Sequence, residues 1–196
     1  MLALLLVLPA QHASADFIVD VYDNLGSFGD VADAIVAMQA TTASNSGSFS
    51  VINFSDGGDL GNFGGDSAFP GNPSDFFGVH VTGIINIFEG FNYFGINHDD
   101  GALLSILGGL TLINSPSPTP PINSFGSVSC GGCGAGYAVD VDLWLYENAG
   151  VASLEFFHSD ASNGVGALVT TVPEPGTLAL FGIGLLGMGL ARRKKA

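Results

Sequence analysis

The chain has 196 residues and a formal net charge of −14, because 18 Asp and Glu residues stand against only four Lys and Arg. All four basic residues lie at positions 192–195, so residues 16–171 hold 17 acidic side chains (the 18 of the chain minus Glu174), no Lys or Arg, and a formal charge of −17 with neutral His. Such a segment has nothing to neutralise phosphates, which excludes nucleic acid as a partner, and carboxylates that lie close together in it need a cation from solution or an altered pKa.

An apolar run from Leu2 to Leu8 opens the chain, and the small residues Ala13-Ser14-Ala15 follow it. This order is typical of a secretory signal peptide with its cleavage site, and we favour it over a buried N-terminal strand. Residues 1–15 are therefore expected to be removed. The body, residues 16–171, would then lie outside the cytoplasm, and its 156 residues suffice for one domain with a core.

The body has mostly the two-residue periodicity of strands. Alternating Phe17, Val19 and Val21 predict a strand over residues 16–22. One helix is predicted over residues 30–39, with Asp30 as N-cap and apolar residues at helical spacing. Further strands are predicted over residues 49–54, 77–82, 84–88, 93–96, 103–107, 111–113, 137–146, 152–158 and 165–169, with a stiff proline-rich loop over 116–121. The expected fold class is all-β, a β-sandwich with one short helix on its N-terminal side.

The middle of the chain contains Phe94-Gly-Ile-Asn-His-Asp-Asp-Gly-Ala-Leu-Leu-Ser-Ile106, a strand, an Asp-Asp-Gly turn and a second strand. This stretch resembles the centre of the PA-14 (protective-antigen-type) domain. Residues 79–83 resemble the strand that precedes it in that family, and residues 146–154 resemble its late strand pair. The resemblance covers roughly residues 76–157 and departs at His98, where the family usually has Ser. It implies a β-sandwich.

In lectin members of that family, the consecutive aspartates ligate calcium, and the ion ligates sugar hydroxyls. The matching positions here are Asp99 and Asp100. Calcium requires six to eight hard oxygen ligands, and adjacent carboxylates can supply several where the backbone turns sharply, as Gly101 permits. The alternative is a tight turn in which both side chains accept hydrogen bonds from backbone N–H groups. The residues themselves leave both interpretations open.

Other candidate chemistry is sparse. Asp140 and Asp142 share one face of a predicted strand, about 6.6 Å apart by strand rise, a spacing that a glycosidase pair could use; alternation favours an ordinary solvent-facing surface. Cys130 and Cys133 are the only thiols. In an oxidising compartment they predict a local structural disulfide rather than a redox or zinc site. Because hydrolase motifs are absent from the sequence, we expect no enzyme.

The tail joins three different segments. Val172-Pro173-Glu174-Pro175 is followed by the uncharged residues 176–191 and by Arg192-Arg193-Lys194-Lys195. Sixteen helical residues span about 24 Å, and the basic cluster at the interface helps such a short transmembrane helix to anchor with its C-terminus inside. This order resembles the PEP-CTERM sorting signal. The resemblance implies a temporary membrane anchor that an exosortase recognises and cuts near the Pro-Glu-Pro motif.

Together these features predict three segments: a signal peptide (1–15), a PA-14-like domain (16–171) and a sorting signal (172–196). We expect an exported protein, held at the inner membrane during processing and then sorted to the cell surface or extracellular matrix. Its expected role is a carbohydrate-associated or adhesive module that binds extracellular polysaccharide through calcium. The alternatives are a structural matrix protein with no defined ligand and, less favoured, an extracellular hydrolase.

Overall fold

The computed structural model of the chain describes residues 16–55, 69–71, 73 and 75–172. This part contains β1 (Phe17–Tyr22), α1 (Val31–Gln39), β2 (Asn45–Phe49), β3 (Asn53–Ser55), β4 (Phe77–Ile87), β5 (Gly90–Asp99), β6 (Ala102–Ile106), β7 (Leu110–Ser115), β8 (Ile122–Cys130), β9 (Tyr137–Glu147), β10 (Ser153–Ser159) and β11 (Val165–Leu168). The expected signal peptide, Pro173–Pro175, the span 176–191 and the basic cluster 192–195 lie outside the described residues. None of the helices described here has the length and hydrophobicity to cross a membrane.

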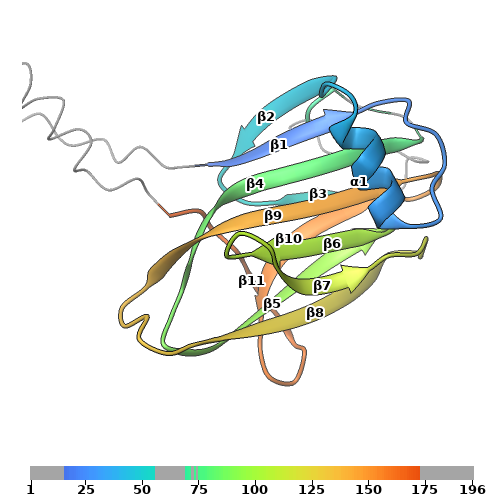
Figure 1. The fold of residues 1–196 in the computed structure, drawn as a ribbon. Coiled ribbons are helices and arrows are strands. Elements are labelled where there is room, and N and C mark those ends of the chain that lie inside the picture. Colours follow the sequence, from blue (N-terminus) through green and yellow to red (C-terminus); the bar gives the residue numbers. More distant parts are fainter. Residues whose placement is uncertain (1–15, 56–68, 72, 74, 173–196) are drawn as a thin grey trace, which may run out of the picture. The chain divides into compact units, whose positions relative to one another are not determined.

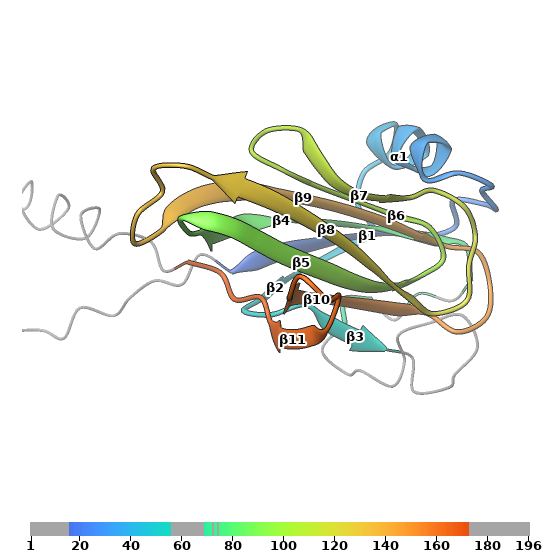
Figure 2. The same cartoon turned by 90° about the horizontal axis from the view of Figure 1, so that it is seen from below.

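The strands form two antiparallel sheets that face each other (Figures 1 and 2). One sheet has the order β2-β1-β4-β9-β6-β7, and the other has β11-β10-β5-β8. Strand β3 pairs with residues 153–155 of β10, beside the part of β10 that pairs with β11. The predicted β-sandwich with one short helix is confirmed. Asp30 caps that helix, because its Oδ1 accepts a 2.7 Å hydrogen bond from the N–H of Ala32.

Some element bounds differ from those predicted. Strands β2 and β8 were not expected from the sequence. The strand expected over residues 49–54 is interrupted: Phe49 ends β2 in one sheet, and residues 53 and 54 belong to β3, which pairs with β10 of the other. The segments 77–82 and 84–88 form one strand, β4, that continues through Gly83. The absence of a Cβ at Gly83 leaves room for the ring of Phe17, so this glycine serves packing and does not end the strand.

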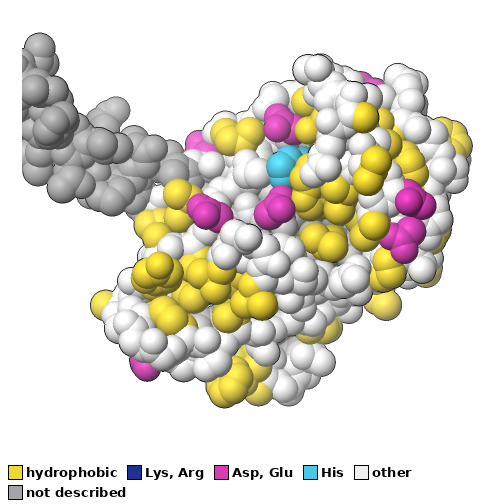
Figure 3. Space-filling view, in the orientation of Figure 1, with side chains coloured by type: hydrophobic (Ala, Val, Ile, Leu, Met, Phe, Trp, Pro, Cys, Tyr) yellow, Lys and Arg dark blue, Asp and Glu magenta, His cyan; other side chains and the backbone are white. Residues whose placement is uncertain are grey.

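The outer face of the six-stranded sheet carries carboxylates around a histidine (Figure 3). His80 lies opposite Asp20 in the register of β1 and β4, and its Nε2 is 2.7 Å from Oδ1 of Asp142. The imidazole also stacks on the indole of Trp144, with ring centroids 3.6 Å apart. Asp140 is exposed on this face. Asp140 and Asp142 therefore lie on an outer sheet surface, as alternation predicts.

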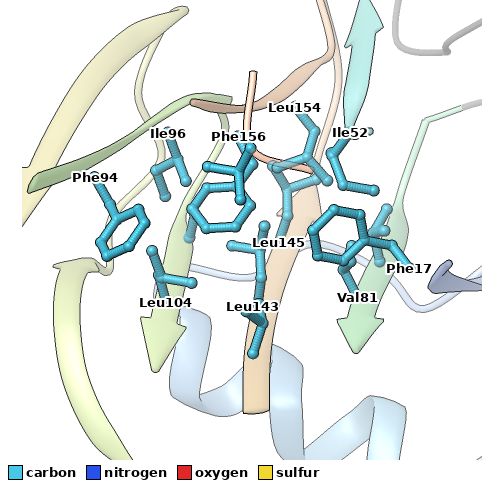
Figure 4. Close-up of a cluster of buried hydrophobic side chains, with 14 of the residues drawn as sticks. Phe17, Ile52, Val81, Phe94, Ile96, Leu104, Leu143, Leu145, Leu154 and Phe156 are labelled. Atoms are coloured by element: carbon cyan, nitrogen blue, oxygen red, sulfur yellow. The ribbon is translucent and has the colours of Figure 1, made fainter. Parts of the chain in front are cut away.

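The core lies between the sheets and is filled by the inward residues of each strand (Figure 4). Leu143 and Leu145 of β9 face Phe156 of β10, and all three are fully buried. The ring of Phe156 meets Phe17 edge-on at 6.1 Å. Each such side chain contributes roughly 1.5–3 kcal/mol by its removal from water. This rigid centre fixes the positions of the loops at both ends.

The sandwich has two distinct ends. The connections at residues 88–89, 107–109 and 131–136 form one end, which we call the exit end because the described chain leaves near it: the N–H of Val172 donates to the carbonyl of Ile84. The turn at residues 100–101 and the loops at 116–121 and 148–152 form the opposite end, which we call the site end. Strand β5 runs from the exit end to the site end, and its ten residues span about 33 Å.

Candidate functional site

The Asp-Asp-Gly turn carries the chain from one sheet to the other. Asp99 ends β5 in one sheet, and β6 begins at Ala102 in the other. The N–H of Asp100 donates to the carbonyl of Tyr146, and the N–H of Tyr146 donates to the carbonyl of Gly101, both at 3.1 Å. The peptide bond between Asp99 and Asp100 is cis. These contacts pin the turn to the end of β9.

The carboxylate of Asp100 joins two loops. Its Oδ1 accepts a hydrogen bond from the N–H of Thr119 at 3.2 Å, and its Oδ2 accepts one from the N–H of Asn148 at 2.9 Å. The Asn148 side chain in turn bonds both the N–H and the carbonyl of Phe28. Hydrogen bonds to an ionised acceptor are stronger than neutral ones. Asp100 therefore holds the proline-rich loop and the loop after β9 in fixed positions.

A third carboxylate completes the cluster. Glu147, fully buried, is the last residue of β9. One oxygen from each of Asp99, Asp100 and Glu147 lies within 4.8 Å of the other two, and all three residues are buried. Burying several carboxylates together is unfavourable unless protons or a cation neutralise them. Because residues 16–172 include no Lys or Arg, that cation has to come from solution.

The sequence analysis did not assign Glu147 to the site, although the alternation of inward residues along β9 points to it. Val139, Val141, Leu143 and Leu145 are the inward residues of β9, and Glu147 is the next position in the same alternation. A carboxylate on the core face of a strand is unusual and requires a compensating partner.

His98 connects the Asp-Asp-Gly turn to strand β8. It is fully buried, with Nδ1 2.6 Å from the carbonyl oxygen of Asp100 and Nε2 2.9 Å from Oγ of Ser124. Burial lowers the pKa of His98, against smaller opposite effects of the Asp100 carbonyl and carboxylate. In the neutral ring, Nδ1–H donates to the carbonyl and Nε2 accepts from the Ser124 hydroxyl, since a carbonyl only accepts. The departure from the usual Ser thus ties the turn to β8.

Tyr146 packs beneath the proline-rich loop. Its hydroxyl donates to the carbonyl of Pro116 at 3.1 Å, and its ring meets Phe28 edge-on at 6.0 Å. Burial, with a smaller effect from the Asp100 charge, raises the pKa of Tyr146 well above its ordinary value. The phenol therefore stays a neutral donor at any physiological pH.

An open hollow of about 440 Å³ lies over the carboxylates. It is lined by Asp99, Asp100, Pro118, Thr119, Pro120, Pro121, Ala149 and Val151. Two of the lining residues are acidic, and all but one of the others are apolar. A small polar ligand with an apolar face would find both kinds of surface there.

The remaining predicted residues lie away from this hollow. Cys130 and Cys133 form a disulfide at the exit end, where Oε2 of Glu89 accepts hydrogen bonds from the N–H groups of Gly132 at 2.6 Å and Gly134 at 3.4 Å. Val172, the first residue of the sorting motif, is the last described residue.

Comparison with protein-family models identifies the tail of the chain. A family model described as the PEP-CTERM protein-sorting motif matches residues 171–195, which confirms the predicted motif. That motif implies export, processing by an exosortase and sorting to the cell surface. No curated protein matches the sequence.

Several solved structures share the fold. The PA14 sugar-binding domain of an RTX adhesin is 15% identical with a TM-score of 0.65, over 82% of this chain and all of that one. The PA14 domain of the MpAFP antifreeze protein is 13% identical with a TM-score of 0.64, over 82% and 93%. The epithelial adhesin 9 A domain from Candida glabrata, solved with Galβ1-4GlcNAc, is 10% identical with a TM-score of 0.55, over 84% and 93%. At these identities the likeness shows the fold, and the fold is that of PA14 domains.

Proposed function

We propose that this chain is an exported PA14-type module that binds glycan at the cell surface through a calcium ion held by Asp99, Asp100 and Glu147. The observation that carries the proposal is the cluster of three buried carboxylates beside an open hollow, in a domain that has no Lys or Arg. The acidic residues are supplied by β5, the turn and β9, which are fixed by the core.

Calcium suits this donor set better than a softer metal. Carboxylate oxygens are hard ligands, and the described cluster contains no Cys or His donor. Calcium takes six to eight oxygens, so three carboxylates leave positions for ligand hydroxyls and water. The apolar walls at Pro118 and Val151 would pack against the C–H face of a sugar ring. The solved relatives named as sugar-binding support a glycan as the ligand.

The two ends of the sequence explain how the protein would reach the cell surface. We propose that residues 1–15 are removed as a signal peptide, that residues 176–191 span the inner membrane, and that Arg192, Arg193, Lys194 and Lys195 hold the C-terminus inside. An exosortase would then recognise Val172–Pro175 and release the body near Pro175. The match to the sorting motif at residues 171–195 supports this sequence of steps.

Calcium binding is tested by thermal unfolding of the protein in EDTA and in 10 mM calcium. Extracellular calcium modules have Kd values of about 10⁻⁴–10⁻³ M, so this concentration should stabilise the fold by about 1.4–2.7 kcal/mol. For a domain of this size, that corresponds to a rise in Tm of about 3–10 °C. The double variant Asp99→Asn/Asp100→Asn should lose the rise.

The matched control is Asp33→Asn/Asp140→Asn, which removes the same charge from two exposed residues that do not belong to the cluster. It should keep the full calcium response. If the site variant responds like the wild type, the ions only screen the negative surface and the calcium proposal is wrong.

Glycan binding is tested on a polysaccharide array with calcium, with EDTA and with the site variant. Binding should require both calcium and the intact aspartates. A protein that binds calcium but no glycan would favour a structural matrix role, and release of reducing sugar would favour a hydrolase. For the sorting steps, mass spectrometry of the surface form in the native host should show loss of the tail, and an intact tail there would contradict them.

A further inference from the structure

Exposed apolar side chains gather at the exit end of the domain. Twelve large apolar side chains are exposed among the described residues, and six of them lie there: Ile84, Phe88, Phe91, Leu107, Leu110 and Tyr137. The register brings three of them close, since Ile87 pairs with Tyr137, Ile84 pairs with Asp140, and the N–H of Leu107 donates to the carbonyl of Asp140. The other three lie in or beside the connections at residues 88–89 and 107–109 of the same end. Figure 3 shows apolar side chains gathered over the turn between β6 and β7 and the start of β9. Such a concentration on one end is typical of an interaction surface.

The covalent chain limits how far this end can lie from a bilayer. Four residue steps lead from Val172, bonded to Ile84 of β4, to Gly176, where the apolar segment of the tail begins. Fully extended, those steps reach about 14 Å. The headgroup layer on one side of a bilayer is itself about 5–8 Å thick. If the tail is inserted with Gly176 at the edge of the hydrocarbon core, Val172 lies at most about 6–9 Å beyond the headgroup layer.

The exit end carries aromatic side chains of the kind found at membrane interfaces. Phe88, Phe91 and Tyr137 are aromatic and exposed, and aromatic side chains are enriched at the boundary between headgroups and acyl chains. Residues 16–172 have no Lys or Arg, so attraction to anionic headgroups contributes nothing. Contact with lipid would therefore depend on these apolar side chains.

We infer that the exit end rests in the headgroup interface of the bilayer while the tail is inserted. The inference rests on the membrane-held stage of the proposed function. Six apolar side chains enter the interface, and β5 carries the carboxylate cluster about 33 Å away from it, toward solvent. The membrane-held protein would thus present its site outward before it is released.

The test uses the full chain reconstituted in phosphatidylcholine vesicles that contain lipid brominated near the headgroup end of the acyl chains. Tyr137→Trp is the reporter, and Val36→Trp on α1 is the matched control. Val36 is 66% exposed, and the N–H of Val31 at the start of α1 donates to the carbonyl of Pro116 in a loop of the site end. The signal of Trp144 is subtracted with the wild type. We expect the Tyr137→Trp signal to be quenched at least two-fold and the Val36→Trp signal to be unchanged.

A second change tests the apolar basis of the contact. Leu107→Asp with Leu110→Asp, added to the reporter, should reduce its quenching to the level of the control. Both positions are exposed, and Leu107 has a positive φ of 54° that Asp adopts more readily, so the fold should tolerate the change. Replacing a third of the lipid by phosphatidylglycerol should also weaken quenching at low salt, and salt should restore it.

The outcomes separate the inference from the proposed function. Vesicle flotation first reports whether the tail is inserted; if the chain does not float, the membrane stage is wrong and this inference falls with it, while calcium and glycan binding stand. If the chain floats and Tyr137→Trp is quenched no more than Val36→Trp, the inference alone is overturned. A blue-shifted reporter without quenching would show that a second copy covers the surface, which also overturns it.

Discussion

Replacing Gly101 by Ala would probe how tightly the site end is packed. A Cβ at this position would lie 2.6 Å from the carbonyl oxygen of Pro116, about 0.8 Å inside the 3.4 Å limit of ordinary contact, and it would overlap the Tyr146 ring more closely still. Tyr146 is fully buried and bonded to the same carbonyl, so neither neighbour can yield alone. Overpacking of this kind costs about 1–3 kcal/mol.

That cost corresponds to a fall in Tm of about 2–12 °C for a domain of this size. Urea unfolding in EDTA measures the free energy directly. The control is Gly131→Ala, since a Cβ there meets nothing within 4 Å and no positive φ opposes it; it should stay within about 0.5 kcal/mol of the wild type. Because the shifted loop also carries Thr119, which bonds Asp100, calcium affinity should fall several-fold.

The reasoning fails if Gly101→Ala unfolds at the same urea concentration as Gly131→Ala. A variant that loses stability but keeps its calcium affinity would show that the proline-rich loop is not part of the ion site.

Three further predictions concern individual groups. Burial lowers the pKa of His98 below its ordinary value, so the stabilising contribution of His98 is complete above about pH 6.5 and is lost as the pH falls. The difference in unfolding free energy between wild type and His98→Gln should therefore shrink from pH 7 to pH 5. A constant difference would contradict this. The exported protein should react with thiol reagents only after reduction, and Cys130→Ser with Cys133→Ser should cost no more than about 2 kcal/mol, because the closed loop is short. Asp30→Ala should destabilise the protein by about 1 kcal/mol in urea unfolding through loss of the helix cap, and no loss would show that the cap is dispensable.

Clear alternation made most of the sandwich predictable. Strand β9 has five inward positions in succession, and both its identity and its face follow from the sequence. Strand β8, Ile-Asn-Ser-Phe-Gly-Ser-Val-Ser-Cys, was missed because its small polar residues have low strand propensity. It forms because β5 pairs with it along its whole length. Tertiary pairing of that kind leaves little trace in a single sequence.

The site was predictable only in part. The turn at Asp99 and Asp100 is local, so the sequence pattern located it. Glu147 joins it from a distant position, at the end of β9, which a single sequence does not place beside the turn. His98 is adjacent in sequence, but its hydrogen bonds to the Asp100 carbonyl and to Ser124 of β8 appear only in the folded chain. The sequence analysis explained Gly101 by the sharp turn of the backbone. In the structure, the absence of a Cβ at Gly101 leaves room for the Tyr146 ring and the Pro116 carbonyl.

The edges of the sandwich bear on how such a protein behaves when it is crowded at a surface. An open strand edge is a template for pairing with other chains and so for aggregation. Along one side of β10, β3 pairs with residues 153–155 and β11 with residues 157–159, so two short strands cover what would be a single long edge. On the opposite side, β8 lies against β7, where a Cβ on Gly126 would meet the carbonyl of Leu112. At these two edges of the five-stranded sheet, little continuous backbone is therefore left to pair with a strand of another chain.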